Sequence, residues 1–384
     1  MKNFRGLLIA IGVMFVFSCS TSTYSGRWVR WNASGIDDYL KFPSYPFRAS
    51  SEPYHFVQAY DENLDQLMIP TGKDKKEALL SAITVSETTA FLIIKNDTIL
   101  YEKYLNGYTR DSINTSFSVA KSITSLLAGV AIDQGLIESR DIEIVKYLPV
   151  LETVDSKYSK VRLSHLLDMK SGIQFKDHDL IWGDKPKAYY HPQLRERIIE
   201  LPVKDEPGIH FKYNSYNPIV VGMVIEQVTG MMPAAYFEKQ IWDQMGMEYP
   251  GSWSLDSDES QMTKMESGLN LRAIDFAKFG RLMLNKGQWE GKSIVSEEWI
   301  EETLSFDKSH LVPDYGVEIF YKNYWWLYST DAEHVDIISG WGHLGQYLYI
   351  FPDTQVIIVR MGKDNDGVRS WGALFKAVNE SVMN

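Results

Sequence analysis

A serine and a lysine three positions apart, Ser118 and Lys121, are the residues of this sequence best placed to do chemistry. From about Phe117 to Gln134, apolar residues recur at three- and four-residue spacings, which predicts a helix. On that helix the Ser118 hydroxyl and the Lys121 amine lie side by side. A serine hydroxyl becomes a useful nucleophile when a neighbouring base takes its proton, and a lysine kept neutral by burial can be that base. The pair therefore indicates nucleophilic catalysis by serine.

So short a spacing also arises by chance, and Ser305 and Lys308 repeat it. They lie in a charged segment without a comparable apolar helix after them, so the context favours Ser118. Other catalytic patterns are missing from the sequence. It has no Gly-x-Ser-x-Gly elbow, which weakens an α/β-hydrolase interpretation, and no His-Glu-x-x-His, which leaves a zinc protease unsupported. We expect neither a metal nor a cofactor.

Two further blocks lie downstream, FKYNSYN at residues 211–217 and GWGHLGQY at residues 340–347. Together with Ser-x-x-Lys, and in this order, they resemble the signatures of the serine β-lactamase-related hydrolases. Those signatures are Ser-x-x-Lys, Tyr-x-Asn and Lys-Thr-Gly or His-x-Gly, and the family includes class C β-lactamases, D-Ala-D-Ala peptidases and related esterases and amidases. The resemblance covers about residues 75–380, and the ordered set is far more specific than any one motif.

This resemblance implies a role for each matching residue. Ser118 carries the acyl group, and Lys121 and Tyr213 move protons, with the base for deacylation left open between these two. The oxyanion hole consists of two backbone N–H groups, those of Ser118 and Gln346. The substrate is held by residues of the two downstream blocks, namely Ser215, Asn217, His343 and Gly345.

Two departures from the class C pattern bear on the substrate. Ser215 stands where that pattern has asparagine, and His343-Leu344-Gly345 replaces Lys-Thr-Gly. Both changes are most like the 6-aminohexanoate-dimer hydrolase branch and its esterase relatives. We therefore expect a serine hydrolase that cleaves a small-molecule or peptide-like amide or ester. The alternatives are a penicillin-interactive peptidase or weak β-lactamase of the same fold, and a non-catalytic envelope lipoprotein that keeps the fold for binding.

The elements that must position these residues fall into strands at both ends and helices between them. A β-hairpin is predicted at residues 90–95 and 99–104, and a mainly helical stretch from about 145 to 270. Further strands are predicted at 324–328, 347–351 and 355–361, before a closing helix at 371–378. We expect an α/β (α+β) fold of the β-lactamase/transpeptidase kind, in which helices flank an antiparallel sheet and an all-helical subdomain is inserted. This hydrolase domain is expected to span residues 66–384.

The N-terminus resembles a bacterial lipoprotein signal. Lys2 and Arg5 precede an apolar stretch too short to span a bilayer comfortably, and Cys19, the only cysteine, follows it. We expect a signal peptide at residues 1–18, acylation of Cys19 and a lipid-anchored protein of the bacterial cell envelope. Residues 19–65 lack helical periodicity, so we expect a tether and an irregular arm whose aromatic residues pack instead of binding ligand.

The composition of the chain limits the classes of molecule that we expect it to bind. The chain of 384 residues has a formal net charge of −11, without a basic run. Such a surface repels phosphate backbones, so nucleic acid is not an expected partner. A single cysteine excludes an intramolecular disulfide.

Overall fold

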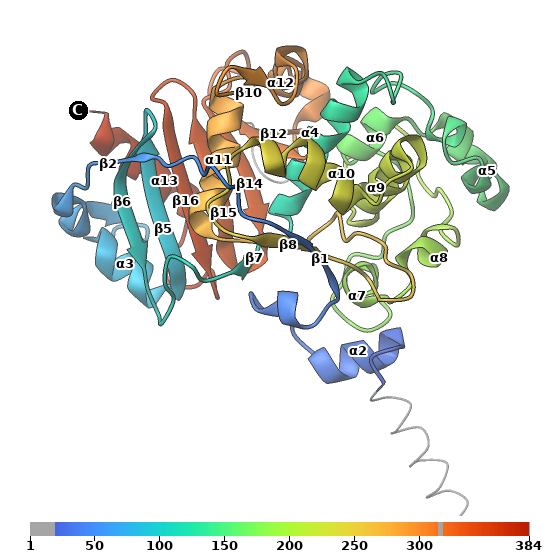
Figure 1. Cartoon of the computed structure of the whole chain (residues 1–384), viewed down its shortest axis with the longest axis horizontal. Helices are drawn as coiled ribbons and strands as arrows, with labels where there is room; N and C mark the ends of the chain where they lie inside the picture. Colours follow the sequence, from blue (N-terminus) through green and yellow to red (C-terminus); the bar gives the residue numbers. More distant parts are fainter. Residues whose placement is uncertain (1–19, 314–317, 384) are drawn as a thin grey trace, which may run out of the picture.

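A large sheet and its covering helices form one side of the molecule, and a group of helices forms the other (Figure 1). The computed structural model describes residues 20–313 and 318–383. The sheet has eight strands, in the order β12 (Ile319–Lys322), β13 (Trp325–Tyr328), β14 (Ile337–Gly342), β15 (Gln346–Phe351), β16 (Val356–Gly362), β5 (Thr88–Lys95), β6 (Thr98–Tyr104) and β2 (Val57–Gln58). All neighbours pair antiparallel except β2, which runs parallel to β6. The expected antiparallel sheet is confirmed.

Alternation along β5 explains why helices cover both faces of this sheet. Leu92 and Ile94 belong to the apolar core that contains α4 (Val119–Asp133) and α11 (Ala273–Leu284). Phe91 and Ile93 point the other way, into the core with α3 (Leu79–Val85) and α13 (Trp371–Val382). Successive side chains of a strand face opposite sides, so one strand supplies both cores.

The other side of the molecule is helical over a shorter stretch than expected. It contains α5 (Val150–Val154), α6 (Leu163–Leu167), α7 (Asp184–Tyr190), α8 (Leu194–Ile198), α9 (Tyr216–Thr229) and α10 (Pro233–Gln240). The expectation of an all-helical segment to about residue 270 is wrong, because β8 (Gly251–Ser254) and β9 (Leu269–Leu271) follow. These strands form a second sheet, in which β8 pairs with β1 (Ser44–Phe47) and β9 with β7 (Asn114–Thr115). Their partners lie far away in the sequence, where local periodicity does not reveal them.

The N-terminal arm is more regular than expected. A helix, α2 (Tyr24–Trp31), begins after Thr23, whose side chain caps the Gly26 N–H. Tyr24, Trp28 and Trp31 recur at i, i+4 and i+7, an apolar spacing that the arm's polar composition conceals. The expected signal peptide at residues 1–18 and the expected acylation site, Cys19, lie outside the described residues.

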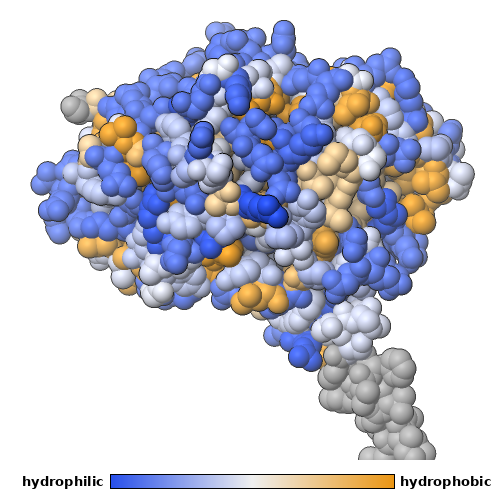
Figure 2. Space-filling model, viewed as in Figure 1, coloured by the Kyte–Doolittle hydropathy of each residue, from blue (hydrophilic) through white to orange (hydrophobic). Residues whose placement is uncertain are grey.

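The surface gives few signs of extended apolar contact. On the face shown in Figure 2, apolar residues form small separate patches on a mainly hydrophilic surface. Within residues 20–313 and 318–383, no single helix combines the length and the apolar composition needed to cross a membrane; one bent pair of helices, at Tyr216–Thr229 and Pro233–Gln244, meets both criteria only when taken together.

The turn between β14 and β15 is fixed by a buried arginine. Arg360 of β16 donates from Nη1 to the carbonyls of Leu344 and Gly345, at 3.2 and 2.8 Å. It also donates to Ser86 O and to Thr88 Oγ1. A buried cation needs hydrogen-bond acceptors, and here carbonyl oxygens supply most of them. The turn His343–Gly345 is therefore tied to the core of the sheet.

Replacing Gly345 by alanine should destabilise the protein well beyond the cost of its backbone conformation. Gly345 has a φ of +77°, and a Cβ there would lie 1.7 Å from Arg360 Nη1. Gly107 is a matched control, with a φ of +83° and no atom within 4 Å of its Cβ position. We expect Gly107→Ala to lower the free energy of unfolding by about 1 kcal/mol and Gly345→Ala by more than about 3 kcal/mol.

Urea unfolding of both variants measures the difference. Equal losses of stability would show that Arg360 does not hold the turn as described.

Candidate functional site

Helix α4 brings Ser118 and Lys121 together. Ser118 is the residue before its first turn, and Lys121 Nζ lies 2.8 Å from Ser118 Oγ. The preceding residue, Phe117, is buried with a φ of +47°, an uncommon conformation for a residue with a side chain. This strained junction delivers the serine to the helix N-terminus, where free N–H groups favour developing negative charge.

Lys121 is almost completely buried, and its surroundings favour the neutral amine. Its Nζ also lies 2.8 Å from the backbone carbonyl of Glu266. Burial lowers the pKa of Lys121 to about 7; the Glu266 carboxylate opposes this shift and the Lys264 ammonium adds to it. At neutral pH a large fraction of Lys121 is therefore able to accept a proton from Ser118.

Tyr213 faces this pair from the loop before α9. The Lys121 ammonium nitrogen lies 5.1 Å from the centre of the Tyr213 ring. An aromatic wall surrounds the ring, because Trp326 stacks on it with centroids 6.0 Å apart and Trp341 stacks on Trp326 at 4.2 Å. Tyr321 meets the Tyr213 ring edge-on at 6.0 Å. The wall holds Tyr213 in place and limits access of water to Lys121.

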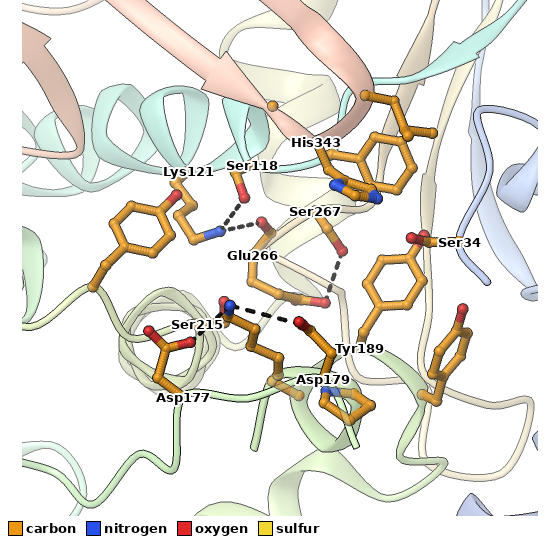
Figure 3. Close-up of a pocket in the computed structure, with 18 of the residues that line it drawn as sticks. Ser34, Ser118, Lys121, Asp177, Asp179, Tyr189, Ser215, Glu266, Ser267 and His343 are labelled. Atoms are coloured by element: carbon orange, nitrogen blue, oxygen red, sulfur yellow. Dashed lines mark hydrogen bonds and ion pairs between the residues drawn. The ribbon is translucent and has the colours of Figure 1, made fainter. Parts of the chain in front are cut away.

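These residues line a cavity of about 760 Å³, a size suited to a small organic molecule. Ser118, Lys121, Tyr213, Ser215 and His343 all contribute to it, so the structure brings five of the predicted residues to one site. Figure 3 shows the hydroxyl of Ser118 and the amine of Lys121 at its inner end, with His343 and Ser215 on different walls.

His343 sits where a lysine would carry a permanent charge in the class C pattern. Its ring meets Phe117 edge-on, with centroids 5.3 Å apart. Burial lowers the pKa of His343 below its ordinary value, although Asp179 and Asp38 oppose the shift. The imidazole is therefore mainly neutral at pH 7 and offers a hydrogen bond instead of a cation.

Two predicted substrate-binding residues, Asn217 and Gly345, do not line the cavity, so the expectation that they hold substrate is wrong. Asn217 is fully buried, accepting from Ser171 Oγ at 2.7 Å and donating to Leu166 O. The Gln346 side chain is buried and donates to Gly362 O at 2.7 Å, whereas the role of its backbone N–H in the oxyanion hole stays a prediction. Gly345 approaches Arg360 instead of a substrate. The turn that precedes β15 carries His343 to the cavity and turns Gly345 and the Gln346 side chain inward.

Sequence reasoning missed a buried ion pair beside the nucleophile. Lys264 Nζ lies 2.7 Å from Glu266 Oε1, to which Ser267 Oγ donates at 2.8 Å. The Lys264 ammonium is also held near the Phe42 and Tyr189 rings, at 4.7 and 4.6 Å from their centres. Glu266 lines the cavity, and its Oε2 is buried without a hydrogen-bond partner within the described part of the chain. The sequence around Lys264 and Glu266 contains no recognisable motif. The rings that surround Lys264 come from Phe42 and Tyr189, far away in the sequence.

The arm also contributes to the cavity. Trp28 of α2 and residues 32–34 after it line the outer part of the wall. Phe42 and Phe47 are buried, as expected for aromatic residues that pack, whereas Trp28 also lines the cavity. Asp177 and Asp179 line the cavity as well and pair with Lys185, at 2.9 and 3.7 Å.

The second Ser-x-x-Lys, formed by Ser305 and Lys308, does not place its two side chains on one helix, as the sequence context suggested. Helix α12 (Glu297–Leu304) ends just before Ser305, and the Ser305 carbonyl accepts a hydrogen bond from Lys322. Lys308 belongs to a separate short turn. The spacing here does not lie along one helix.

One group of side chains could hold a metal ion, judged from residues 20–313 and 318–383. The ligand atoms of His334, Asp336 and Asp353 lie within 4.8 Å of one another. None of the three lines the cavity. The acyl-transfer residues therefore do not depend on this group.

Known proteins resemble this chain in both sequence and fold. A family model described as Beta-lactamase matches residues 78–382. The 6-aminohexanoate-dimer hydrolase of Paenarthrobacter ureafaciens is 26% identical over 304 residues, which are 75% of this chain and 76% of that protein. A solved structure assigned as a 6-aminohexanoate-dimer hydrolase from Bacillus anthracis has a TM-score of 0.79 at 21% identity, covering 94% of this chain and 95% of that one. A penicillin-binding protein from Bacillus halodurans has a TM-score of 0.61 at 17% identity, covering 79% and 99%.

Removing the charge of Glu266 should shift the pH dependence of Ser118 reactivity to lower pH. The carboxylate favours protonated Lys121, so Glu266→Gln lowers the Lys121 pKa, while the amide still accepts hydrogen bonds from Lys264 and Ser267. Because the neutral amine is the reactive form, the rate rises with pH through about 7 in the wild type and at lower pH in the variant. Rate profiles between pH 5 and 9 measure the shift.

Glu290→Gln is the control, because Glu290 is exposed and pairs with Arg281 outside the cavity lining. An unchanged profile for Glu266→Gln, or a shift to higher pH, would remove Glu266 from the electrostatics of Lys121.

Proposed function

This chain belongs to the beta-lactamase family of serine hydrolases, and we propose that it cleaves linear amide or ester bonds through an acyl-enzyme intermediate on Ser118. The observation that carries the proposal is the 2.8 Å contact between Ser118 Oγ and Lys121 Nζ, with the lysine buried and its pKa lowered to about 7. Serine hydrolases need a base at this distance that is neutral at working pH.

The first half of the reaction uses the inner end of the cavity. Lys121 takes the Ser118 proton while Oγ attacks the substrate carbonyl carbon. The oxyanion that forms is stabilised by backbone N–H groups, each contributing about 3 kcal/mol. Ser118 supplies one of these. We assign the second donor to the backbone N–H of Gln346, the first residue of β15, which directly follows the His343–Gly345 turn.

The first half ends when the leaving group departs, which needs a proton, and the second half needs a water molecule that attacks the acyl-serine ester. Tyr213 lines the same cavity, with its ring centre 5.1 Å from Lys121 Nζ, and we assign its hydroxyl the transfer of the proton from Lys121 to the departing nitrogen or oxygen. The same Lys121 and Tyr213 pair then activates the water that releases the acyl group from Ser118.

The pocket chemistry favours a linear substrate over a β-lactam. A mainly neutral His343 lacks the permanent charge that would hold a lactam carboxylate. Ser215 is shorter than asparagine and lacks the amide donor–acceptor pair. The relative from Paenarthrobacter ureafaciens bears the name of a hydrolase of 6-aminohexanoate dimer, a linear amide by that name. These points support a linear amide or ester and disfavour the alternative of a penicillin-interactive enzyme.

We further propose that the protein is anchored in the bacterial cell envelope through acylated Cys19. The support is the sequence alone, an apolar stretch after Lys2 and Arg5 that ends at the only cysteine of the chain. A lipid at this position places the hydrolase at a membrane surface, with substrates drawn from the envelope.

Removing the Tyr213 hydroxyl should abolish most turnover without unfolding the protein. Tyr213→Phe keeps the ring that packs between Trp326 and Tyr321, so its thermal stability should match that of the wild type. Loss of a proton relay should lower kcat by about 10²–10⁴-fold. The loss should be larger for a linear anilide than for a p-nitrophenyl ester, whose leaving group scarcely needs a proton.

Nitrocefin should be a poor substrate of either protein, with kcat/KM below about 10⁴ M⁻¹s⁻¹.

Tyr158→Phe is the matched control for Tyr213→Phe, since it also removes the hydroxyl of a buried tyrosine, one that donates to Leu201 O and does not line the cavity. A Tyr213→Phe enzyme with wild-type kcat on both linear substrates would exclude the proposed relay. Efficient turnover of nitrocefin would favour the penicillin-interactive alternative.

A further inference from the structure

The described part of the chain begins at Ser20, and Ser20 packs directly against helix α2. The Ser20 carbonyl accepts a hydrogen bond from Thr23 N at 3.4 Å. It lies so close to α2 that a Cβ added to Gly26 would come within 1.8 Å of it. A single residue adds at most about 3.8 Å of reach. A lipid on Cys19 would therefore hold α2 directly against the bilayer, and the expected tether is absent from residue 20 onward.

Helix α2 is itself fastened to the body. Arg27 is buried, donates from Nε to Thr21 O at 2.7 Å and from Nη1 to Asp256 O, and lies over the Trp31 ring. Tyr24 Oη donates to Ile181 O at 2.5 Å. Figure 1 shows α2 beside α7 at one end of the molecule. Helix α2 and the chain from Ser20 onward are therefore joined firmly to the body.

Large apolar side chains are exposed around this anchor point. Leu180 and Trp182, on either side of the carbonyl that Tyr24 binds, are 51% and 59% exposed. Val29 of α2 is 48% exposed, but it lies five residues after Tyr24, on a different face of the helix from the one that contacts the Leu180–Trp182 loop. Tryptophan and aliphatic side chains at the surface of a membrane-bound protein partition into the interfacial layer of the bilayer. Stable anchoring by lipid is strengthened by such a second contact.

The same segments form the mouth of the catalytic cavity. Trp28 and residues 32–34 come from α2 and the turn after it, and Asp177 and Asp179 immediately precede the Leu180–Trp182 loop. The cavity mouth and the exposed apolar residues thus share one end of the molecule.

We infer that Leu180 and Trp182 form a membrane-docking rim that rests on the lipid bilayer beside the mouth of the cavity. The inference rests on the proposed acylation of Cys19 and extends the proposed function, because it orients the cavity towards amphiphilic amides or esters that reside in the membrane. It does not depend on which linear substrate Ser118 attacks.

Spin labelling tests the rim directly, since acylation leaves the chain without a free thiol. The full chain is expressed with its signal, reconstituted into vesicles of phosphatidylethanolamine and phosphatidylglycerol, and labelled with a nitroxide at Leu180→Cys. The control is Val85→Cys, at the end of α3, because Val85 is 69% exposed and Figure 1 places α3 far from α2. We expect accessibility to oxygen, relative to a water-soluble nickel chelate, to rise several-fold at position 180 on reconstitution and to stay unchanged at position 85.

Equal accessibility ratios at the two positions would overturn the rim. Recovery of the chain in the soluble fraction, or behaviour of Cys19→Ala like that of the wild type, would overturn the anchoring on which it rests. Turnover of a soluble p-nitrophenyl ester, measured on the same samples, separates these failures from failure of the hydrolase. A Leu180→Ser/Trp182→Ser variant should keep that soluble activity and lose at least about half of its activity on a vesicle-embedded ester.

Discussion

The burial of one lysine amine next to one serine hydroxyl is the interaction on which the rest of this site depends. An amine taken out of water loses the solvation of its charged form, and this loss is what makes Lys121 a base near neutral pH. A buried neutral amine acts as a base for Ser118 only if it points towards the Ser118 hydroxyl, so the orientation of the Lys121 side chain must be fixed. Helix α4 sets the three-residue spacing, and the Glu266 carbonyl and Ser118 Oγ receive the amine at 2.8 Å each.

Several distant segments maintain that environment. The Lys264–Glu266 pair supplies opposite charges whose effects on Lys121 partly cancel, and Phe42 from the arm closes around the Lys264 ammonium. The stacked rings of Trp326 and Trp341, on two neighbouring strands, exclude water from the side of Tyr213. Arg360 fixes the turn that carries His343. The Ser-x-x-Lys motif sets only the spacing of Ser118 and Lys121. Keeping the Lys121 amine away from water also requires each of these surrounding segments.

The sequence predicted the parts of this arrangement that are local. Helical periodicity placed Ser118 and Lys121 on one face, alternation predicted the hairpin of β5 and β6, and the ordered motifs identified Tyr213, Ser215 and His343 as neighbours. It misassigned Asn217 and Gly345, because a motif does not say which of its residues face inward; Asn217 bonds to Ser171 and Leu166, and Arg360 holds the turn that contains Gly345. It missed Glu266 and Trp28 because each becomes part of the cavity through contacts with segments far along the chain.

The most direct test of the account is the pH dependence and location of Ser118 phosphonylation by a fluorophosphonate probe. The adduct is located by peptide mass spectrometry, and its rate of formation is measured between pH 5 and 9, with Ser118→Ala as the blank. The account predicts modification at Ser118, with a rate that rises about tenfold per pH unit below 7 and levels off above it. Modification at Ser305 instead, or a rate at Ser118 that does not change across this range, would contradict it.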